Sequence, residues 1–463
     1  MPAVMRAAAA AERAGVPAVA IGGGGFEPMG RAIAKSLGIS HVPIVSYPGV
    51  ILADDSATFR TKMRYEVAPA VVDALVAESP GTGEVATAPE EPEREHSTRA
   101  VVFSGELDAV QDHFEEQGWT DGLPIVPPTL ERVDAFLART RRDPNEVLGS
   151  LAPEQREATV WNVAVNGVLA GCTPEHMPVL LGIVECLVDP VFRVADAGST
   201  PGWEPLVVLS GPVVERLGFN SGTGVMRVGR RANTAVGRFV RLYLRNLAGL
   251  RTPPDHTDQG AIATSFNVVL AENDDAVRDA GWSSFREDRG FAAADSVVTV
   301  QSCVTISAPI YSAGEDAAGH LHALTVGMRD AMGPWSYTGM EFGAWHPLLV
   351  VGPSIARALA GYGIDKTAIR AHLAEHARIT VAELERCAWA VGSTGFRVDE
   401  LVRRGELDQR YAGTDPQRTV PMCTRADDIG IVLAGNPSRN QSRGYVQNHV
   451  QGAPVSRRIE EEP

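Results

Sequence analysis

The segment from Arg227 to Arg241 concentrates positive charge in an acidic chain. It holds five arginines in fifteen residues, whereas the chain as a whole has 57 acidic and 42 basic residues and a formal net charge of -15. Its spacing predicts a break at Gly229, a cap at Asn233-Thr234 and then a helix carrying arginines at helical intervals. Guanidinium groups bind carboxylate and phosphate in a planar fork, and a helix start favours anions.

The predicted substrate-binding residues for a small carboxylate or phosphate are Asn220, Arg231, Asn233, Arg238 and Arg241. Asn220 belongs to the loop Gly218–Gly224, whose small residues expose backbone N–H groups just before the arginines. The alternative is that these arginines pair with the chain's own carboxylates, as surface charges commonly do.

The thiol of Cys172 is the predicted catalytic group. A helical pattern ends at Gly171, and Thr173-Pro174 is a typical start of a second helix, so the thiol lies at a helix N-terminus, where its pKa falls. Glu175 and His176 follow three and four residues later and are candidate proton carriers. The alternative is a small buried cysteine chosen for packing.

The sequence predicts no metal site, but it offers one set of candidate ligands. His320 and His322 alternate as on a strand, which would place both imidazoles on one face. The acidic segments 255–258 and 272–275 could add carboxylates, although their spacing matches no metal signature.

Composition indicates a globular protein and excludes several classes. The chain has 463 residues, 44% hydrophobic and 21% charged, with no apolar run long enough for a membrane helix and no secretory signal pattern. We therefore expect a cytoplasmic protein that binds no membrane. Its acidity argues against nucleic acid, and its five scattered cysteines argue against a disulfide framework.

The elements that must position these residues are of the α/β class. Residues 1–78 alternate helix and strand but show only two strands, so they form a small, incomplete α/β module. Residues 79–99 are acidic and proline-rich and predict a flexible linker, and residues 100–463 predict a larger mixed α/β domain with a cleft. The polar run from Asn436 to Pro463 predicts a loosely packed tail.

The N-terminal module resembles a known family. Ala10–Ala20, Phe26, the run Ala32–Gly38 and Tyr47-Pro48 are similar to the body of the UGSC family, in which selenocysteine or cysteine, glycine, serine and cysteine form a redox centre before the first helix. Here the chain begins inside that helix and no cysteine precedes Cys172, so neither redox residue can be assigned. We expect either a start further upstream or a module that has become a scaffold. Through Phe114–Thr129, Val163–Pro178 and the arginine segment, residues 110–450 are similar to a large uncharacterised bacterial domain associated with that group.

Three functions follow as hypotheses. The favoured one is a thiol-dependent enzyme, inclined by the resemblance toward an oxidoreductase, that acts on a small carboxylated substrate held by the arginines. The second is a metal-assisted lyase or hydratase, and the third is a non-catalytic subunit or ligand-binding scaffold. The sequence identifies no cofactor; the expected partners are the small anion and either a second copy of the chain or a thiol-bearing subunit.

Overall fold

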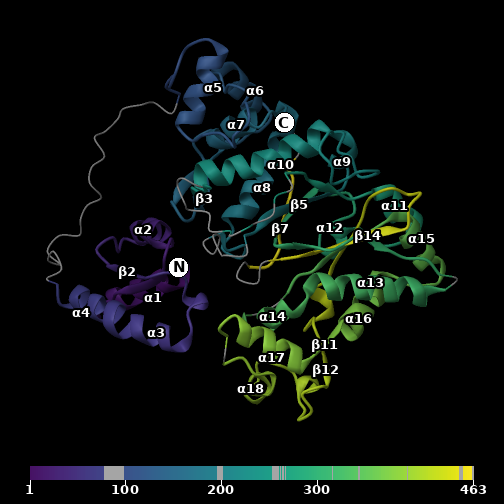
Figure 1. Ribbon diagram of the computed structural model, residues 1–463. Helices are drawn as coiled ribbons and strands as arrows, with labels where there is room; N and C mark the ends of the chain where they lie inside the picture. The colour runs from purple at the N-terminus through teal and green to yellow at the C-terminus, as the bar shows by residue number, and fades with distance from the viewer. Residues whose placement is uncertain are drawn as a thin grey trace.

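The structure is a computed structural model that describes residues 1–77, 99–194, 202–252, 260, 262, 265, 267–314, 316–342, 345–393, 395–447 and 452–460. Helices and sheets are mixed throughout these residues (Figure 1), so the α/β prediction is confirmed. The predicted linker lies outside the described residues except for its last position.

The N-terminal module contains two parallel strands and the helices that cover them. Strand β1 (Ala20–Gly23) pairs in parallel with β2 (Ile44–Tyr47), as a βαβ unit requires. Its small core is separate from the others and includes Met5 and Met29. The other elements are α1 (Pro2–Arg13), α2 (Glu27–Ser36) and a continuous helical run made of α3 (Ser56–Lys62), the π-helical η2 (Met63–Val67) and α4 (Ala68–Val76).

The first sheet of the larger part of the chain has the order β15-β7-β5-β6. Strand β5 (Glu204–Ser210) is antiparallel to β7 (Val297–Cys303) and parallel to β6 (Leu270–Ala271). Every residue of β5 and β7 is buried. Helix α8 (Met177–Val188) packs on this sheet, and two further helices pack against α8: α7 (Val160–Leu169) and α10 (Arg231–Tyr243).

The second sheet has the order β13-β10-β14-β8. Strand β10 (Leu348–Val351) is parallel to β13 (Gly430–Leu433) and antiparallel to β14 (Gln441–Val446). Strand β14 also pairs with two short strands, β8 (Thr305–Ile306) and β9 (Ile310–Tyr311), and is covered by α13 (Ala317–Met332).

The two sheets share one buried cluster. Leu206 and Val208 of β5 belong to it together with Leu348 and Val350 of β10 and Val432 of β13. This apolar contact fixes the first sheet against the second, and so the loops at their ends are held in place.

The larger part contains further helices and strands. They are α5 (Leu107–Glu116), α6 (Leu130–Leu137), β3 (Val147–Leu151), β4 (Arg156–Thr159), η3 (Pro174–His176), α9 (Val213–Arg216), η5 (Leu244–Ala248), α11 (Asp274–Ala280), α12 (Phe285–Asp288), α14 (Tyr337–Phe342), α15 (Pro353–Gly361), α16 (Lys366–His376), β11 (Arg378–Thr380), α17 (Val381–Ala390), α18 (Val398–Arg403), β12 (Thr419–Pro421) and β15 (Val455–Arg458).

The prediction of a loosely packed C-terminal tail is wrong. Strand β14 lies inside the second sheet, where Tyr445 and Val446 are buried, and β15 is antiparallel to β7 in the first sheet. The sequence pattern failed here because Arg443, Arg457 and Arg458 interrupt both strands with charge at positions whose long side chains reach the surface.

Candidate anion-binding site

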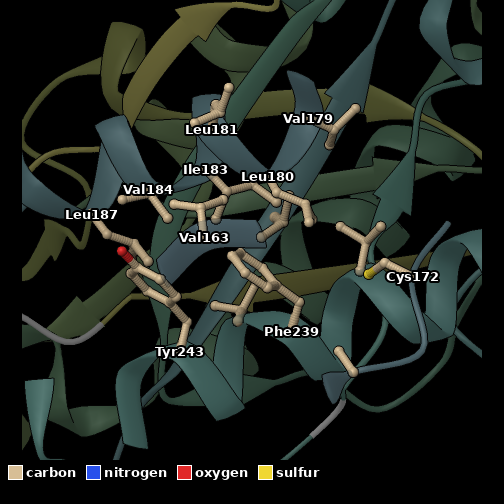
Figure 2. Close-up of a cluster of buried hydrophobic side chains, with 14 of the residues drawn as sticks. Val163, Cys172, Val179, Leu180, Leu181, Ile183, Val184, Leu187, Phe239 and Tyr243 are labelled. Carbon is tan, nitrogen blue, oxygen red and sulfur yellow. The ribbon is translucent and has the colours of Figure 1, made fainter. Parts of the chain in front are cut away.

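Cys172 lies in the apolar core. Its side chain is at the edge of the cluster around α8, with Val179, Leu180 and Phe239 (Figure 2), and the residue is only 6% exposed. Burial raises the pKa of the thiol well above its usual range, although Arg231 and Arg238 act in the opposite direction. The protonated thiol is therefore the stable form, contrary to the lowered pKa expected from a helix N-terminus.

Lowered pKa values make Glu175 and His176 weak proton acceptors for this thiol. Glu175 is paired with Arg139 at 2.7 Å, and hydrogen bonds lower the pKa of its carboxyl group. His176 is buried, and its Nδ1 accepts a hydrogen bond from the backbone N–H of Thr173 at 3.0 Å. The neutral ring therefore carries its proton on Nε2 and is a donor there. Burial lowers the pKa of His176 to about 4, with a contribution from Arg231.

Two of the predicted substrate-binding arginines are already engaged by carboxylates. Arg238 forms a fork with Asp121, with bonds of 2.8 and 2.7 Å, and also donates to two backbone carbonyl oxygens of the same loop. Arg241 lies 3.7 Å from Glu204, whose side chain is 4% exposed. These contacts tie α10 to the loop before α6 and to the first sheet, so their geometry is structural.

The two predicted asparagines also stabilise the fold. Asn233 is fully buried inside α10 and does not cap it, because the helix begins at Arg231. Its side-chain oxygen accepts from the backbone N–H of Asn220, and its amide donates to the carbonyl oxygens of Asn220 and Val269. Asn220 itself closes its own loop by bonding to Gly222 and Thr223.

Among the described residues, the exposed arginines at the start of α10 have no carboxylate partner. We name Arg227, Arg230 and Arg231 the arginine triplet. Arg230 donates only to the carbonyl oxygen of Gly218 and Arg231 only to that of Gly171, and among the described residues none of the three forms an ion pair. No side chain caps the first turn of α10. Positive charge and the open helix start therefore coincide.

The fold brings the predicted segments together at this place. The bond from Arg231 to Gly171 fixes the start of α10 beside the Cys172 turn, and the ring of Phe219 lies 5.7 Å from that of His176. The loop Gly218–Gly224 in turn accepts a bond from the N–H of Gly435 at 2.9 Å, through the carbonyl oxygen of Ser221. The sequence missed Arg227 and Arg230 as binding residues, and it holds no signal that separates them from Arg238 and Arg241, because the whole segment Arg227–Arg241 lacks acidic residues.

The histidine pair does not share a face. His320 and His322 lie on helix α13 and not on a strand, so they point about 200° apart; His320 is buried against Ser312 and His322 is exposed. The segment 255–258 lies outside the described residues. In the part of the chain that the structure describes, no group of three or more His, Cys, Asp or Glu side chains is arranged to hold a metal ion.

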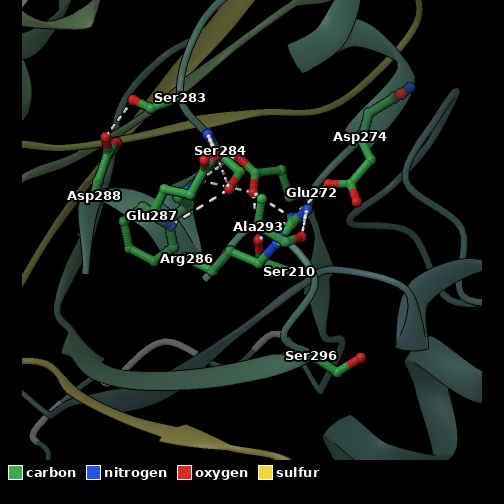
Figure 3. Close-up of polar contacts among 12 residues, drawn as sticks. Ser210, Glu272, Asp274, Ser283, Ser284, Arg286, Glu287, Asp288, Ala293 and Ser296 are labelled. Atoms are coloured by element: carbon green, nitrogen blue, oxygen red, sulfur yellow. Dashed lines mark hydrogen bonds and ion pairs between the residues drawn. The ribbon is translucent and has the colours of Figure 1, made fainter. Parts of the chain in front are cut away.

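Glu272 and Asp274 of the segment 272–275 belong to a buried polar network (Figure 3). Glu272 is fully buried; it accepts from Ser210 at 2.5 Å and from the backbone N–H of Phe285, and burial raises the pKa of its carboxyl group. Lys366, 2% exposed, lies 3.8 Å from Glu272 and 3.0 Å from Asp288. The network joins the end of β5 to α12 and α16, and each carboxylate in it already has partners, which is typical of structural networks.

Fold and site thus define an α/β protein with a cationic surface beside a buried thiol. Comparison with known proteins adds that residues 2–77 match the family model described as the UGSC family, so the chain carries an N-terminal UGSC module joined to a larger domain. That part of the prediction is confirmed. No curated protein and no solved structure matches the chain. No helix among the described residues is long and apolar enough to span a membrane.

Proposed function

We propose that the larger domain binds a small carboxylate or phosphate at the arginine triplet. One observation carries the proposal: three neighbouring arginines have no ion pair among the described residues, in a chain with 57 acidic residues. Arg238 and Arg241, on the same helix, are paired. The three positive charges repel one another and so destabilise the folded state, and a bound anion would reduce this repulsion.

The expected affinity is modest. A hydrogen bond to a charged group contributes about 1.5–3 kcal/mol, and exposed arginines act near the lower limit. Three such contacts predict a dissociation constant between about 1 mM and 10 µM. Binding should weaken as salt is added, because the site is exposed and screened.

Calorimetric titration with succinate and with inorganic phosphate at low ionic strength tests the proposal. The variant Arg227→Ala/Arg230→Ala/Arg231→Ala should lose saturable binding. A matched control, Arg278→Ala/Arg386→Ala/Arg403→Ala, removes the same charge from exposed positions on α11, α17 and α18 and should bind as the wild type does. Equal loss in both variants would mean that only net charge matters, and the proposal would fail.

A thiol-dependent reaction at Cys172 is the second candidate. It is favoured by Arg231 and Arg238, whose charges both act to lower the pKa of this thiol. It requires solvent to reach a sulfur that the core covers, so native-state alkylation is its direct test. The class of oxidoreductase rests on the family resemblance. A lyase or hydratase using His320 and His322 has no geometric support.

A further inference from the structure

A cationic cavity lies near the turn that holds Glu175, whose partner Arg139 belongs to the lining. It has a volume of about 600 Å³, within the range of small-molecule sites. It is formed by the loop after α6, by α8, α9, the segment before β7 and the end of β15. The lining residues used below are Arg139, Arg141, Arg216, Arg458, Pro178 and Ile459.

Positive charge dominates this cavity. Arg139, Arg141, Arg216 and Arg458 line it, against two acidic residues. Arg139 pairs with Glu175, and Arg458 lies 3.8 Å from the lining residue Asp295. The guanidinium groups of Arg141 and Arg216 form no hydrogen bond or ion pair with any described residue. Two arginines from different elements therefore face a common space with their donors unused.

The acidic side chains of the lining are already engaged. Asp295 accepts from the backbone N–H of Ala292 in addition to its contact with Arg458, and Glu460 lies 3.9 Å from Arg142. Among the described contacts, neither carboxylate pairs with Arg141 or Arg216. An anion in the cavity would thus meet net positive charge.

The rest of the cavity wall is partly apolar. Pro178, Leu181, Pro212 and Ile459 contribute to it. The hydroxyl oxygen of Ser296 accepts from the backbone N–H of Val213 at 3.0 Å, which leaves its own proton free to be donated to a ligand.

A glycine permits close packing of the wall. Gly211 has a φ of +106°, and a Cβ there would lie 2.2 Å from the carbonyl oxygen of Asp295. The turn before α9 can therefore approach the segment before β7 only because residue 211 has no side chain.

We propose that this cavity binds a phosphate ester, with the phosphate between Arg141 and Arg216 and a compact apolar body against Pro178 and Ile459. Two unpaired guanidinium groups match the charge of a phosphate dianion, and the apolar wall gives the ester group a surface that inorganic phosphate cannot use. The cavity has no lining residue in common with the arginine triplet, so this site is independent of the proposed function.

The test is calorimetric titration with phenyl phosphate and with inorganic phosphate. Phenyl phosphate should bind about tenfold more tightly, because burying a ring adds apolar contact. Arg141→Ala and Arg216→Ala should each weaken phenyl phosphate about tenfold through loss of a charge-assisted contact. Both side chains are exposed and have no ion pair among the described residues, so the thermal midpoints of these variants should stay unchanged and report intact folding.

Arg386→Ala, which removes an exposed arginine from α17, is the control and should bind as the wild type does. Three results would overturn the proposal: no saturable binding, equal affinity for the two probes, or binding that the arginine-triplet variant removes while Arg141→Ala and Arg216→Ala retain it. The last result would assign the phosphate to the start of α10.

Discussion

Replacing Arg238 and Arg231 one at a time tests which arginine stabilises the fold and which binds the anion. Sequence spacing places Arg238 with Arg231 as a substrate residue, whereas in the structure its guanidinium is held by Asp121 and two carbonyl oxygens. We expect Arg238→Ala to destabilise the larger domain and to leave anion binding nearly unchanged. Arg231→Ala should do the reverse.

The magnitude follows from the burial of the pair. The side chains of Arg238 and Asp121 are 17% and 16% exposed, so they are neither surface nor fully buried. Removing one partner of a fully buried pair costs about 3–5 kcal/mol, and an exposed pair contributes below about 1 kcal/mol. We expect a loss of about 3 kcal/mol, which at an unfolding entropy of about 2.1 cal/mol/K per residue lowers Tm by about 4 °C.

Differential scanning calorimetry measures the loss, and succinate titration well below Tm measures binding. Arg238→Lys keeps the charge without the fork and should recover less than half of the stability. The double variant Arg238→Ala/Asp121→Ala should cost less than the sum of the single variants, because it leaves no uncompensated charge. Unchanged Tm in Arg238→Ala together with loss of succinate binding would refute this reasoning.

Three further predictions concern the buried groups. Alkylation of the native protein with iodoacetamide should label Cys387, the one cysteine that is not buried, long before Cys172; rapid labelling of Cys172 would instead favour the thiol-dependent reaction. Because the folded-state pKa of His176 is lowered to about 4 from 6.5, its neutral ring is favoured by folding, so stability is complete above pH 6.5 and declines as pH falls toward 4. Urea unfolding should show a loss of about 2 kcal/mol from this group at pH 5, absent in His176→Gln, and a pH profile identical in both proteins would contradict the assignment. Lys366→Met should cost about 3–5 kcal/mol in the same assay because it removes a buried cation that pairs with both Glu272 and Asp288, and Lys366→Met/Glu272→Gln should restore part of it; equal stability of the single variant and the wild type would show that the pairs are not coupled.

Local pattern was sufficient for the elements with strong periodicity. Helix α16 (Lys366–His376) and strand β10 (Leu348–Val351) coincide with a helical and an apolar pattern in the sequence, and the two strands expected within residues 1–78 are β1 and β2. Apolar residues at period 3.6 or in a short β-branched run determine these structures through burial of one face or both. The UGSC resemblance was also readable, since it depends on residue order alone.

The sequence pattern was not sufficient where a short segment is compatible with both a helix and a strand. Gly319-His-Leu-His-Ala alternates as a strand does, yet it is the first part of α13, which Asp316 caps by accepting from the N–H groups of Ala318 and Gly319. The alternation extends over only five residues, and the longer helical period that follows decides the outcome. The proposed metal pair depended on that short alternation.

The sequence by itself determined that a cationic segment would follow a small-residue loop in an acidic chain, and that a thiol would follow a helix end. Only the tertiary structure decided which arginines are free. Arg238 and Arg241 meet Asp121 and Glu204, residues 117 and 37 positions away, because α10 packs against α7 and α8. The triplet lies at the start of the helix, where no acidic side chain of the described residues pairs with it. Ion pairing depends on distance in space and burial, and neither is written in the spacing of charges along the chain.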